Sequence, residues 1–580
     1  MMREEHSVDE GEVVVVVPER AVHIDELYPG VYPVGGAESV TRKFEIIAAC
    51  VMGLSTLSGG VLEGYTSPAI PTLLQEDTYD NQTDVTLMSD VSTISTTLGS
   101  NFSSNAGPVT HNNSYLLNSN NSNDDLSVLL RGETELELST DLFLTEEEAS
   151  WLGSLLLLGA CIGALVSSWV ISLGRRRAVL ASALPRLIGW IMISAASDVY
   201  MMYGGRFLTG VSLGIVTSAA PVYISEIAHS SMRGALSCVV QLGVNMGIFT
   251  IALLGTFMEW RGLAIFGAFT VVVYFVATLF IPNSPVWLVA CGREDDARKT
   301  LTRLRGHHYC VEYDLQQIIS SKASQYNAFS WLDIITHRSC VFPLGVVALV
   351  TVVNRCSGYN AIITFCATFL HQAVPAVSEY WAATVVTLMQ VFSTVGAAVF
   401  VDKLGRRKLL MTSIAAMAIA LATIAICEVA TKYGAGGSWV AILAAIVYVS
   451  AYSFGVGPIT WVLVGEMFPQ AAREKAAAVI SVLNWFLAFI ITKTYFRLES
   501  LTGIAGTCTV YSSVCVIGLI LVYLLVPETK GRTLGEIEAY FTYTQRSWKV
   551  VKNKRDVALS SILDQEGGTS DSYSTFQSVE

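Results

Sequence analysis

Apolar runs of about 20 residues recur along this 580-residue chain, and they constrain its fold more than any other feature. A helix of that length crosses the roughly 30 Å hydrocarbon core of a bilayer. The chain is 52% hydrophobic and only 14% charged, which is too apolar for a soluble globular protein. Uninterrupted runs favour helices over the short alternating strands of a barrel, so the sequence predicts an all-α membrane protein. Twelve spans are expected, at residues 46–70, 150–173, 178–198, 201–225, 234–257, 262–282, 341–370, 380–401, 409–428, 438–465, 474–497 and 504–526.

The net charge of -12 comes from one segment and therefore says little about partners. Between Pro71 and Ala149 there are fourteen acidic residues and one base, Arg131. None of the 11 cysteines lies in that segment, and a thiol in an apolar run behaves as a small buried hydrophobe. We therefore expect no disulfide framework, no metal site and no cofactor. The polar first 43 residues lack the apolar core of a signal peptide, so no cleaved signal is expected.

Two independent signals predict the orientation in the membrane. The loop 71–149 carries four N-x-S/T sequons, which predict glycosylation outside the cytosol at Asn81, Asn101, Asn112 and Asn120. Basic clusters follow the second run at 175–177 and the eighth run at 403–408, which the positive-inside rule assigns to the cytosol. Both termini are then cytosolic. The predicted location is the plasma membrane, and an internal membrane would leave the same pattern.

Paired signatures divide the chain into two six-helix halves. A Gly-Arg-Arg turn at 174–176 returns at 405–407, and Glu226 with Arg233 is matched by Glu466 with Arg473. Two such halves enclose a midplane site in many secondary transporters. The expected organisation is an N-terminal tail, a half with the glycosylated loop, a cytosolic linker with short helices, a second half and a cytosolic tail, at 1–43, 44–282, 283–340, 341–526 and 527–580.

Several short motifs occur in a fixed order along the chain: Gly205-Arg206-Phe207, Pro221 to Glu226, Arg233-Gly234, Gln241-Leu242, Asp402 to Arg407, Gly457 to Trp461, Asn484-Trp485 and Pro527 to Arg532. In this order and spacing they resemble the signatures of the sugar porter family of the major facilitator superfamily. Gly64 to Pro68 and Thr492-Lys493-Thr494 look most like insect facilitated trehalose and sugar transporters. The resemblance covers residues 44 to 541.

The resemblance implies a major facilitator fold and a transmembrane transporter of a sugar, meaning a hexose, trehalose or a related polyol, that works by alternating access. Proton-driven relatives place an Asp where Thr66 stands, so facilitated diffusion is expected. No phosphate loop, nucleophile-base motif or metal-ligand spacing is present in the sequence, and we expect no enzyme activity. The expected partners are a small-molecule substrate and the bilayer, without nucleic acid, and the sequence sets no oligomeric state.

Amides and tryptophans at membrane depth suit a polyol, because hydroxyls donate and accept hydrogen bonds and sugar C–H faces stack on rings. An intramembrane amide can equally join two helices. By resemblance, the substrate-binding residues are Gln241, Asn354, Arg355, Asn360, Gln390, Trp461, Asn484 and Trp485.

The resemblance also implies ion-pair clusters that hold the outward-open state at the cytosolic side. Basic turns without a gating role would look similar in sequence. The first copy departs from the family pattern at Ile171 and Ser172, which makes a gate in the N-terminal half less secure than in the second. The expected gate residues are Arg175, Arg176, Glu226, Arg233, Asp402, Arg406, Arg407, Glu466 and Arg473.

Arg355 is the main departure from the family, which carries glutamines before the Ser-Gly-x-Asn motif. An unpaired Arg at mid-bilayer costs about 2.5–3.5 kcal/mol on the insertion scale. Glu63, inside the first span, is the predicted partner, and the two residues are expected to form a charge pair that lines the cavity. Two other functions stay open: a transporter-like nutrient sensor without transport, and a porter of a charged organic solute.

Overall fold

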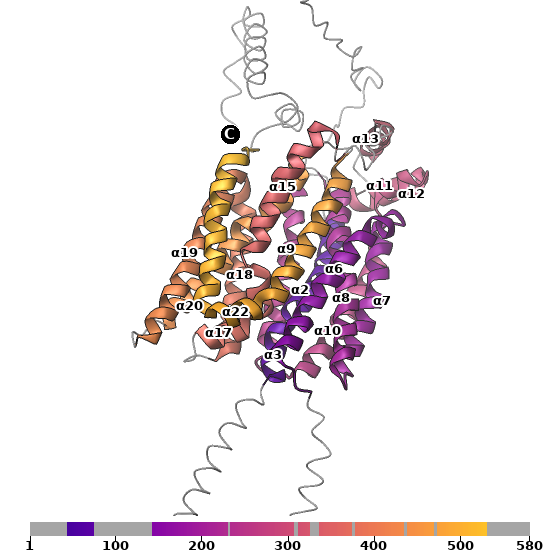
Figure 1. Ribbon diagram of the computed structural model, residues 1–580. Helices are drawn as coiled ribbons and strands as arrows, with labels where there is room; N and C mark the ends of the chain where they lie inside the picture. Colours follow the sequence, from indigo (N-terminus) through magenta and orange to yellow (C-terminus); the bar gives the residue numbers. More distant parts are fainter. Residues whose placement is uncertain are drawn as a thin grey trace, which may run out of the picture.

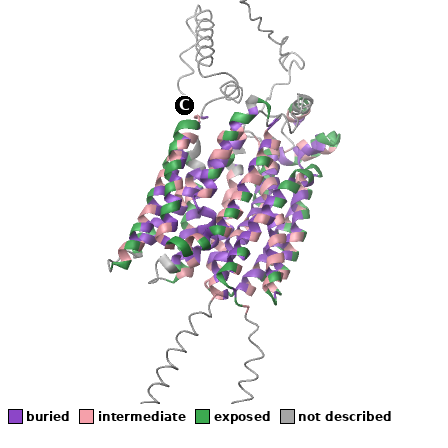
Figure 2. Cartoon of the chain, viewed as in Figure 1, coloured by how far each residue is buried: buried purple, intermediate pink, exposed green. Residues whose placement is uncertain are grey.

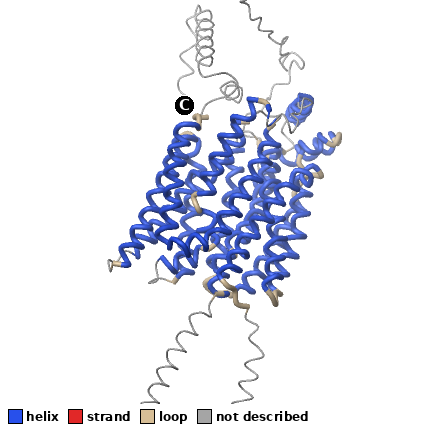
Figure 3. The backbone as a smooth tube through the Cα atoms, in the orientation of Figure 1, coloured by secondary structure: helices blue, strands red, loops and turns tan. Residues whose placement is uncertain are grey.

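The computed structural model of this chain describes residues 43–74, 142–229, 233–306, 311–324, 334, 336–373, 378–433, 438–468 and 472–529. Every regular element among them is a helix (Figure 3). The four predicted glycosylation sites lie outside the described residues, as do most of the loop 71–149 and both tails.

Seven helices build the N-terminal half (Figure 1). Its first span is divided into α2 and α3 at Tyr65, and Pro68 and Pro71 follow the division. Proline removes a backbone donor and is tolerated in a spanning helix only where neighbours satisfy the freed groups. The helices are α2 (Lys43–Gly64), α3 (Thr66–Leu73), α6 (Glu146–Ser172), α7 (Arg175–Ser194), α8 (Val199–Ile227), α9 (Arg233–Leu254) and α10 (Trp260–Phe280).

The C-terminal half repeats the division of its first span. Gly358 has φ 86°, a left-handed conformation that ends α15 and that L side chains rarely adopt. The elements are α15 (Arg338–Cys356), α16 (Tyr359–Thr364), α17 (Cys366–Ala373), α18 (Glu379–Leu404), α19 (Arg406–Lys432), α20 (Ser438–Ala451), the π-helical turn η2 (Tyr452–Val456), α21 (Gly457–Met467) and α22 (Arg473–Leu525). Three short helices lie between the halves: α11 (Pro285–Ala290), α12 (Glu294–Arg305) and α13 (Val311–Ser324).

Ten helical segments among the described residues are long and apolar enough to cross a membrane. One of them, Lys475–Leu525, has 51 residues, about 75 Å of helix and more than twice the hydrocarbon thickness. Gly503, with φ 68°, breaks this segment between the two runs that the sequence separates. The expected fifth span appears as a shorter apolar helix, Cys238–Leu254. The count of twelve spans stays a prediction, and each expected run coincides with helix.

The two halves lie side by side (Figure 1), and they meet where α6 packs on α22 and α9 packs on α18. The helices α11 to α13 lie at one end of the bundle, which we call the linker face (Figure 1). We call the opposite end, where α3 ends and α6 begins, the loop face. Buried and exposed residues alternate along the helices (Figure 2). The exposed residues include large apolar ones such as Trp169 and Phe280. An apolar exterior is what a lipid environment requires.

Candidate functional site: a polar network between the halves

A buried polar junction joins the two halves near the middle of the bundle. Gln390 on α18 donates through Nε2 to Asn245 Oδ1 on α9 at 2.9 Å and to the Tyr359 hydroxyl on α16 at 2.6 Å. Asn245 donates to Thr394 Oγ1 one turn along α18, and it accepts from Gln241 Nε2 at 3.1 Å. Gln390 and Asn245 are 0% and 1% exposed. Because buried amides satisfy each other across the interface, this junction fixes how α9 and α18 align.

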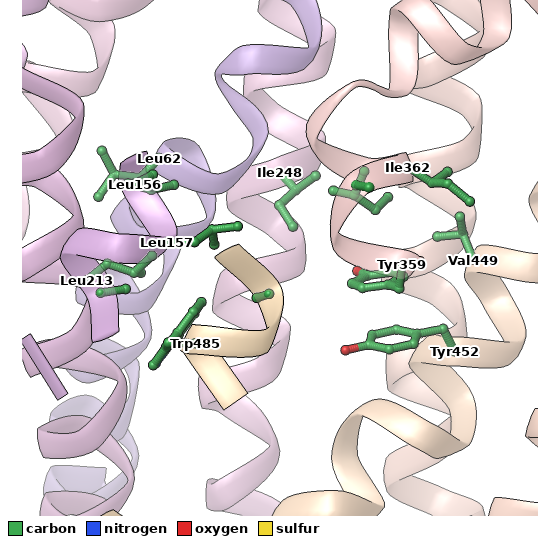
Figure 4. Close-up of a cluster of buried hydrophobic side chains, with 14 of the residues drawn as sticks. Leu62, Leu156, Leu157, Leu213, Ile248, Tyr359, Ile362, Val449, Tyr452 and Trp485 are labelled. Carbon is green, nitrogen blue, oxygen red and sulfur yellow. The ribbon is translucent and has the colours of Figure 1, made fainter. Parts of the chain in front are cut away.

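Two stacked tyrosines extend the junction into the C-terminal half. The ring centroids of Tyr359 and Tyr452 lie 3.3 Å apart with an interplanar angle of 8° (Figure 4). The Tyr452 hydroxyl donates to Asn354 Oδ1 at 3.2 Å, and Asn354 Nδ2 donates to Thr460 Oγ1 at 3.0 Å. Both ends of the Asn354 amide are therefore bonded to protein groups, and Asn354 ties α15 to η2 and α21.

Arg355 is a buried cation held by amides and not by a carboxylate. Its Nε donates to Asn484 Oδ1 at 2.7 Å, and its Nη1 donates to Asn360 Oδ1. The guanidinium carbon lies 5.7 Å from the centroid of the Trp485 ring, within cation–π range. Arg355 also sits in the last turn of α15, where the helix dipole favours positive charge. Three other predicted substrate residues thus converge around the Arg355 guanidinium.

Glu63, the predicted partner of Arg355, lies on α2 in the N-terminal half. It is half-buried and lies next to the last residue of α2. Among the described residues, no ion pair within 4.0 Å joins Glu63 to Arg355. The two charges are separated in this conformation, and their pairing across a cavity stays a prediction.

Trp461 stands apart from the other predicted substrate residues. It follows the buried Thr460 on α21, but it is 40% exposed, and no hydrogen bond to the network is seen among the described residues. Gln241 reaches the network only through Asn245. The remaining predicted residues belong to one connected set of contacts. Two pairs of residues that are adjacent in the sequence, Asn354-Arg355 and Tyr359-Asn360, link its parts.

An ion pair holds helix ends together at the linker face of the N-terminal half. Arg175, at the start of α7, places Nη2 2.8 Å from Glu226 Oε1 at the end of α8. Ser284 donates to the other Glu226 oxygen at 2.5 Å and also caps α11. Arg176 donates instead to backbone carbonyls at the end of α10, at 3.0 and 2.6 Å. One carboxylate therefore joins α7, α8 and the first linker helix.

The C-terminal half repeats this arrangement. Arg406 Nη2 lies 2.9 Å from Glu466 Oε1, and the Thr529 hydroxyl donates to Glu466 Oε2 at 2.6 Å. Arg407 donates to a backbone carbonyl near the end of α22, as Arg176 does at α10. Glu528 adds a second carboxylate, which accepts from the backbone N–H groups of Arg406 and Arg407 at 3.0 and 3.2 Å. A carboxylate at the start of α19 also complements the helix dipole.

Of the other three predicted gate residues, Arg473 alone has a described side chain. Arg473 donates through Nη2 to the Phe468 carbonyl at 3.5 Å, and no contact with Glu466 is seen among the described residues. The side chains of Arg233 and Asp402 lie outside the described residues.

Several residues of the network were not singled out from the sequence. Asn245 lies one helical turn after Gln241, a spacing that places both amides on one face of α9 and that could have indicated it. Tyr359 precedes the predicted residue Asn360, but neither Tyr359 nor Tyr452 carries a signal of its own in the sequence. The hydroxyls of Ser284 and Thr529 lie in the Pro-Asn-Ser-Pro and Pro-Glu-Thr repeats at 282–285 and 527–529, so the internal repeat could have indicated them.

Comparison with known proteins identifies the family to which this chain is similar. The family described as "Sugar (and other) transporter" matches residues 88–541. The facilitated trehalose transporter Tret1 of Polypedilum vanderplanki is 33% identical over 427 residues, which cover 73% of this chain and 85% of that protein. Tret1 of Bombyx mori is 33% identical and covers 71% and 82%. Sugar transporter ERD6-like 6 of Arabidopsis thaliana is 35% identical and covers 70% and 85%.

Solved structures show the same fold. The major facilitator proton:xylose symporter XylE, bound to 6-bromo-6-deoxy-D-glucose, superposes with a TM-score of 0.64 at 19% identity, over 86% of this chain and 99% of that one. A partially occluded inward-open XylE from E. coli gives a TM-score of 0.63 at 17% identity, over 85% and 100%. The fold is therefore that of the major facilitator superfamily. The chain belongs to the sugar (and other) transporter family.

Proposed function

We propose that this protein carries a sugar or a related polyol across a membrane by alternating access, without coupling to a second solute. The observation that supports this most is the polar network, which lies where the two halves meet and takes side chains from both. A solute bound there contacts both halves, so rocking one half against the other exposes it to each side in turn.

The network suits a polyol because it mixes neutral donors, neutral acceptors and aromatic faces. Within the part of the chain that the structure describes, the buried Asn484 Nδ2 donor and Gln390 Oε1 acceptor have no hydrogen-bond partner. An unpaired buried polar group costs about 1–3 kcal/mol, so a ligand hydroxyl that pairs with it gains affinity. Trp485 supplies a ring beside the amides. Two relatives are named facilitated trehalose transporters, which makes trehalose one candidate beside the hexoses.

The ion pairs at Glu226 and Glu466 serve, in this proposal, as the gate at the linker face. Partly buried ion pairs act better as two-state contacts than as net stabilisers, because opening exposes both partners to water. Each ion pair holds helix ends together within its own half. It therefore sets the shape of the surface that contacts the other half at the linker face. In the same proposal Arg233, Asp402 and Arg473 join the gate in other conformations.

The linker face is proposed to lie in the cytosol of a plasma-membrane protein, with both termini on that side. The basic starts of α7 and α19 support this orientation through the positive-inside rule. The loop 71–149 then faces outward with its four sequons. A mobility shift after glycosidase treatment, lost when Asn81, Asn101, Asn112 and Asn120 are all changed to Gln, would support the outward loop. An unchanged mobility would contradict it.

Uptake of labelled glucose and trehalose into cells that express the chain tests the function. Saturable uptake that is independent of a pH gradient is the expected result. Gln390→Leu should abolish it because this change removes the junction, whereas Glu312→Gln, in an exposed ion pair of α13, should leave uptake unchanged. Sugar binding without uptake would instead indicate a sensor.

A further inference from the structure

An open basic cavity lies at the linker face, where the end of α10 meets the linker helix α12. Its volume is about 310 Å³, roughly ten times the 30 Å³ that one water molecule takes up in the liquid. The charged residues that line it are four bases, Arg176, Arg293, Lys299 and Arg303, and one acid, Asp296. The cavity therefore has room for a chemical group larger than a single water or ion, and its lining carries three positive charges in excess.

Two of these bases are held in place by the backbone of α10. Arg176, at the start of α7, donates to the Thr278 and Leu279 carbonyls at 3.0 and 2.6 Å. Arg303, on α12, donates to the Phe280 carbonyl at 3.3 Å. These bonds cap a helix end whose dipole amounts to about half a negative charge. No carboxylate lies within 4.0 Å of either guanidinium among the described residues, so both cations are fixed without being neutralised.

The linker helix α12 turns one face toward the cavity. Asp296, Lys299, Thr300 and Arg303 all line it, and their spacing of three, four and seven residues places them on one side of a helix. Asp296 forms an ion pair with Arg293 at 2.6 Å, and the Lys299 Nζ atom is 3.9 Å from the other oxygen of the same carboxylate. The Lys299 side chain is 79% exposed. The single acid of the described lining is thus taken by Arg293, and Lys299 remains available to a ligand.

An apolar strip on the surface of α10 leads to this cavity. Phe269, Val272, Val276 and Phe280 follow one another at intervals of three and four residues, and they are 62, 49, 46 and 72% exposed. The helix is one of the segments that are long and apolar enough to cross a membrane. Phe280, the last residue of the strip, also lines the cavity. The cavity therefore begins where the lipid-facing surface of α10 ends, which is the depth of the lipid headgroups.

We propose that this cavity binds the phosphate group of an anionic membrane lipid whose acyl chains lie along the apolar strip of α10. The remaining N–H donors of Arg176 and Arg303 and the Lys299 ammonium group donate to the phosphate oxygens, and guanidinium groups suit phosphate geometry well. A soluble phosphate would use the same donors but would leave the strip uncovered. The bound phosphate joins α7, α10 and α12, so it holds the linker against the N-terminal half.

Competition for a fluorescent phosphatidic acid bound to the full-length protein in detergent tests the site. The competitors are unlabelled dioleoyl phosphatidic acid, dioleoyl phosphatidylcholine, which has the same chains and no net charge, and glycerol 3-phosphate, which has the phosphate and no chains. Phosphatidic acid should compete at a concentration at least tenfold lower than either of the others. Equal competition by the two lipids would overturn the proposal. Glycerol 3-phosphate competing as well as phosphatidic acid would overturn the lipid as the occupant and assign the cavity to a soluble phosphate.

Variants of α12 locate the binding within the cavity. Lys299→Gln should weaken phosphatidic acid binding about fivefold, the contribution of one basic residue near a membrane surface. Asp296→Asn removes the acid that repels a phosphate and should strengthen binding several-fold.

Arg298→Gln is the matched control, because Arg298 is the neighbouring base on α12 but pairs with Glu312 and does not line the cavity. It should change binding less than twofold. Equal weakening by Lys299→Gln and Arg298→Gln would show attraction to the whole basic surface and would overturn the site.

Discussion

Gln390 and Asn245 are hydrogen-bonded across the interface between the two halves, with 2.9 Å between Gln390 Nε2 and Asn245 Oδ1. This bond connects α18 to α9 inside the bundle, and both residues are completely or almost completely buried. A sliding or rocking motion of one half against the other must break or re-form it. The network therefore lies at the contact that alternating access has to change.

Replacing Gln390 tests this junction. Gln390→Leu keeps similar volume but removes the donor to the buried Tyr359 hydroxyl, at about 1–3 kcal/mol, and leaves Asn245 Oδ1 with Gln241 alone. We expect the maximal uptake rate to fall at least tenfold and the melting temperature to fall by a few degrees. Gln390→Glu retains an acceptor but loses the Nε2 donor and should also fail. Normal uptake by both variants would show that the junction is not needed.

The ion pair in the C-terminal half tests the gate. Glu466→Gln removes the charge that Arg406 and Thr529 share at 2.9 and 2.6 Å, and the maximal uptake rate should fall more than the apparent affinity for sugar. The matched control is Glu312→Gln, because its ion pair with Arg298 is about half exposed and such pairs contribute only about 0–1 kcal/mol. Equal uptake by Glu466→Gln and Glu312→Gln would contradict a gating role.

A separate ion pair connects the halves at the loop face. Lys493 Nζ lies 2.8 Å from Glu147 Oε1 and 4.3 Å from the centroid of the Trp151 ring. Lys493→Met removes both contacts and should shift the population toward an open loop face.

Opening of the loop face can be followed at Ser67, whose hydroxyl accepts a hydrogen bond from the Ala367 N–H of the other half at 3.1 Å. A cysteine introduced at this position becomes more accessible when the halves separate. Its labelling by a thiol reagent in purified protein should be several-fold faster with Lys493→Met than without it. The same proteins with Ser67 intact give the background from the native cysteines. An unchanged rate would mean that this ion pair does not hold the loop face closed.

The buried pair of Glu45 and Arg305 docks the linker onto the N-terminal half. Arg305, at the end of α12, bonds to Glu45 on α2, to the Ile227 carbonyl at 3.0 Å and to Asp314 on α13 at 3.2 Å. Glu45 is 0% exposed. Arg305→Met therefore leaves a buried carboxylate without its cation, a loss of about 3–5 kcal/mol.

Thermal unfolding in detergent measures this loss. We expect Arg305→Met to lower the melting temperature clearly, and Glu45→Gln combined with Arg305→Met to recover part of it, because the double variant no longer buries a charge. A double variant as unstable as the sum of the two single variants would rule out direct coupling between these residues.

The helical segments and the two ion pairs at the linker face could be predicted from the sequence because both depend on local patterns. Apolar runs of bilayer length predict helices wherever they occur, and the repeated Gly-Arg-Arg turns with their acids predict Arg175 near Glu226 and Arg406 near Glu466. Each of these ion pairs has a short N–O distance and lies within a single half. Neither therefore depends on how the halves are placed relative to each other.

The partners of Arg355 could not be predicted in the same way. The sequence indicated a carboxylate, Glu63, but the guanidinium is held by the oxygens of Asn360 and Asn484. Which amide turns toward which neighbour depends on the rotation of α15 and α22 about their axes, and hydrophobic periodicity is weak in spans that are apolar on most sides. Asn245 was missed for the same reason, since its partner Gln390 lies in the other half.

Counterflow in liposomes that contain only the purified protein tests the central claim most directly. Vesicles preloaded with unlabelled glucose or trehalose should transiently accumulate the same labelled sugar without a pH gradient, and the Gln390→Leu protein should not. Sugar binding by the purified protein without counterflow for either sugar would contradict transport and leave a binding protein with a transporter fold.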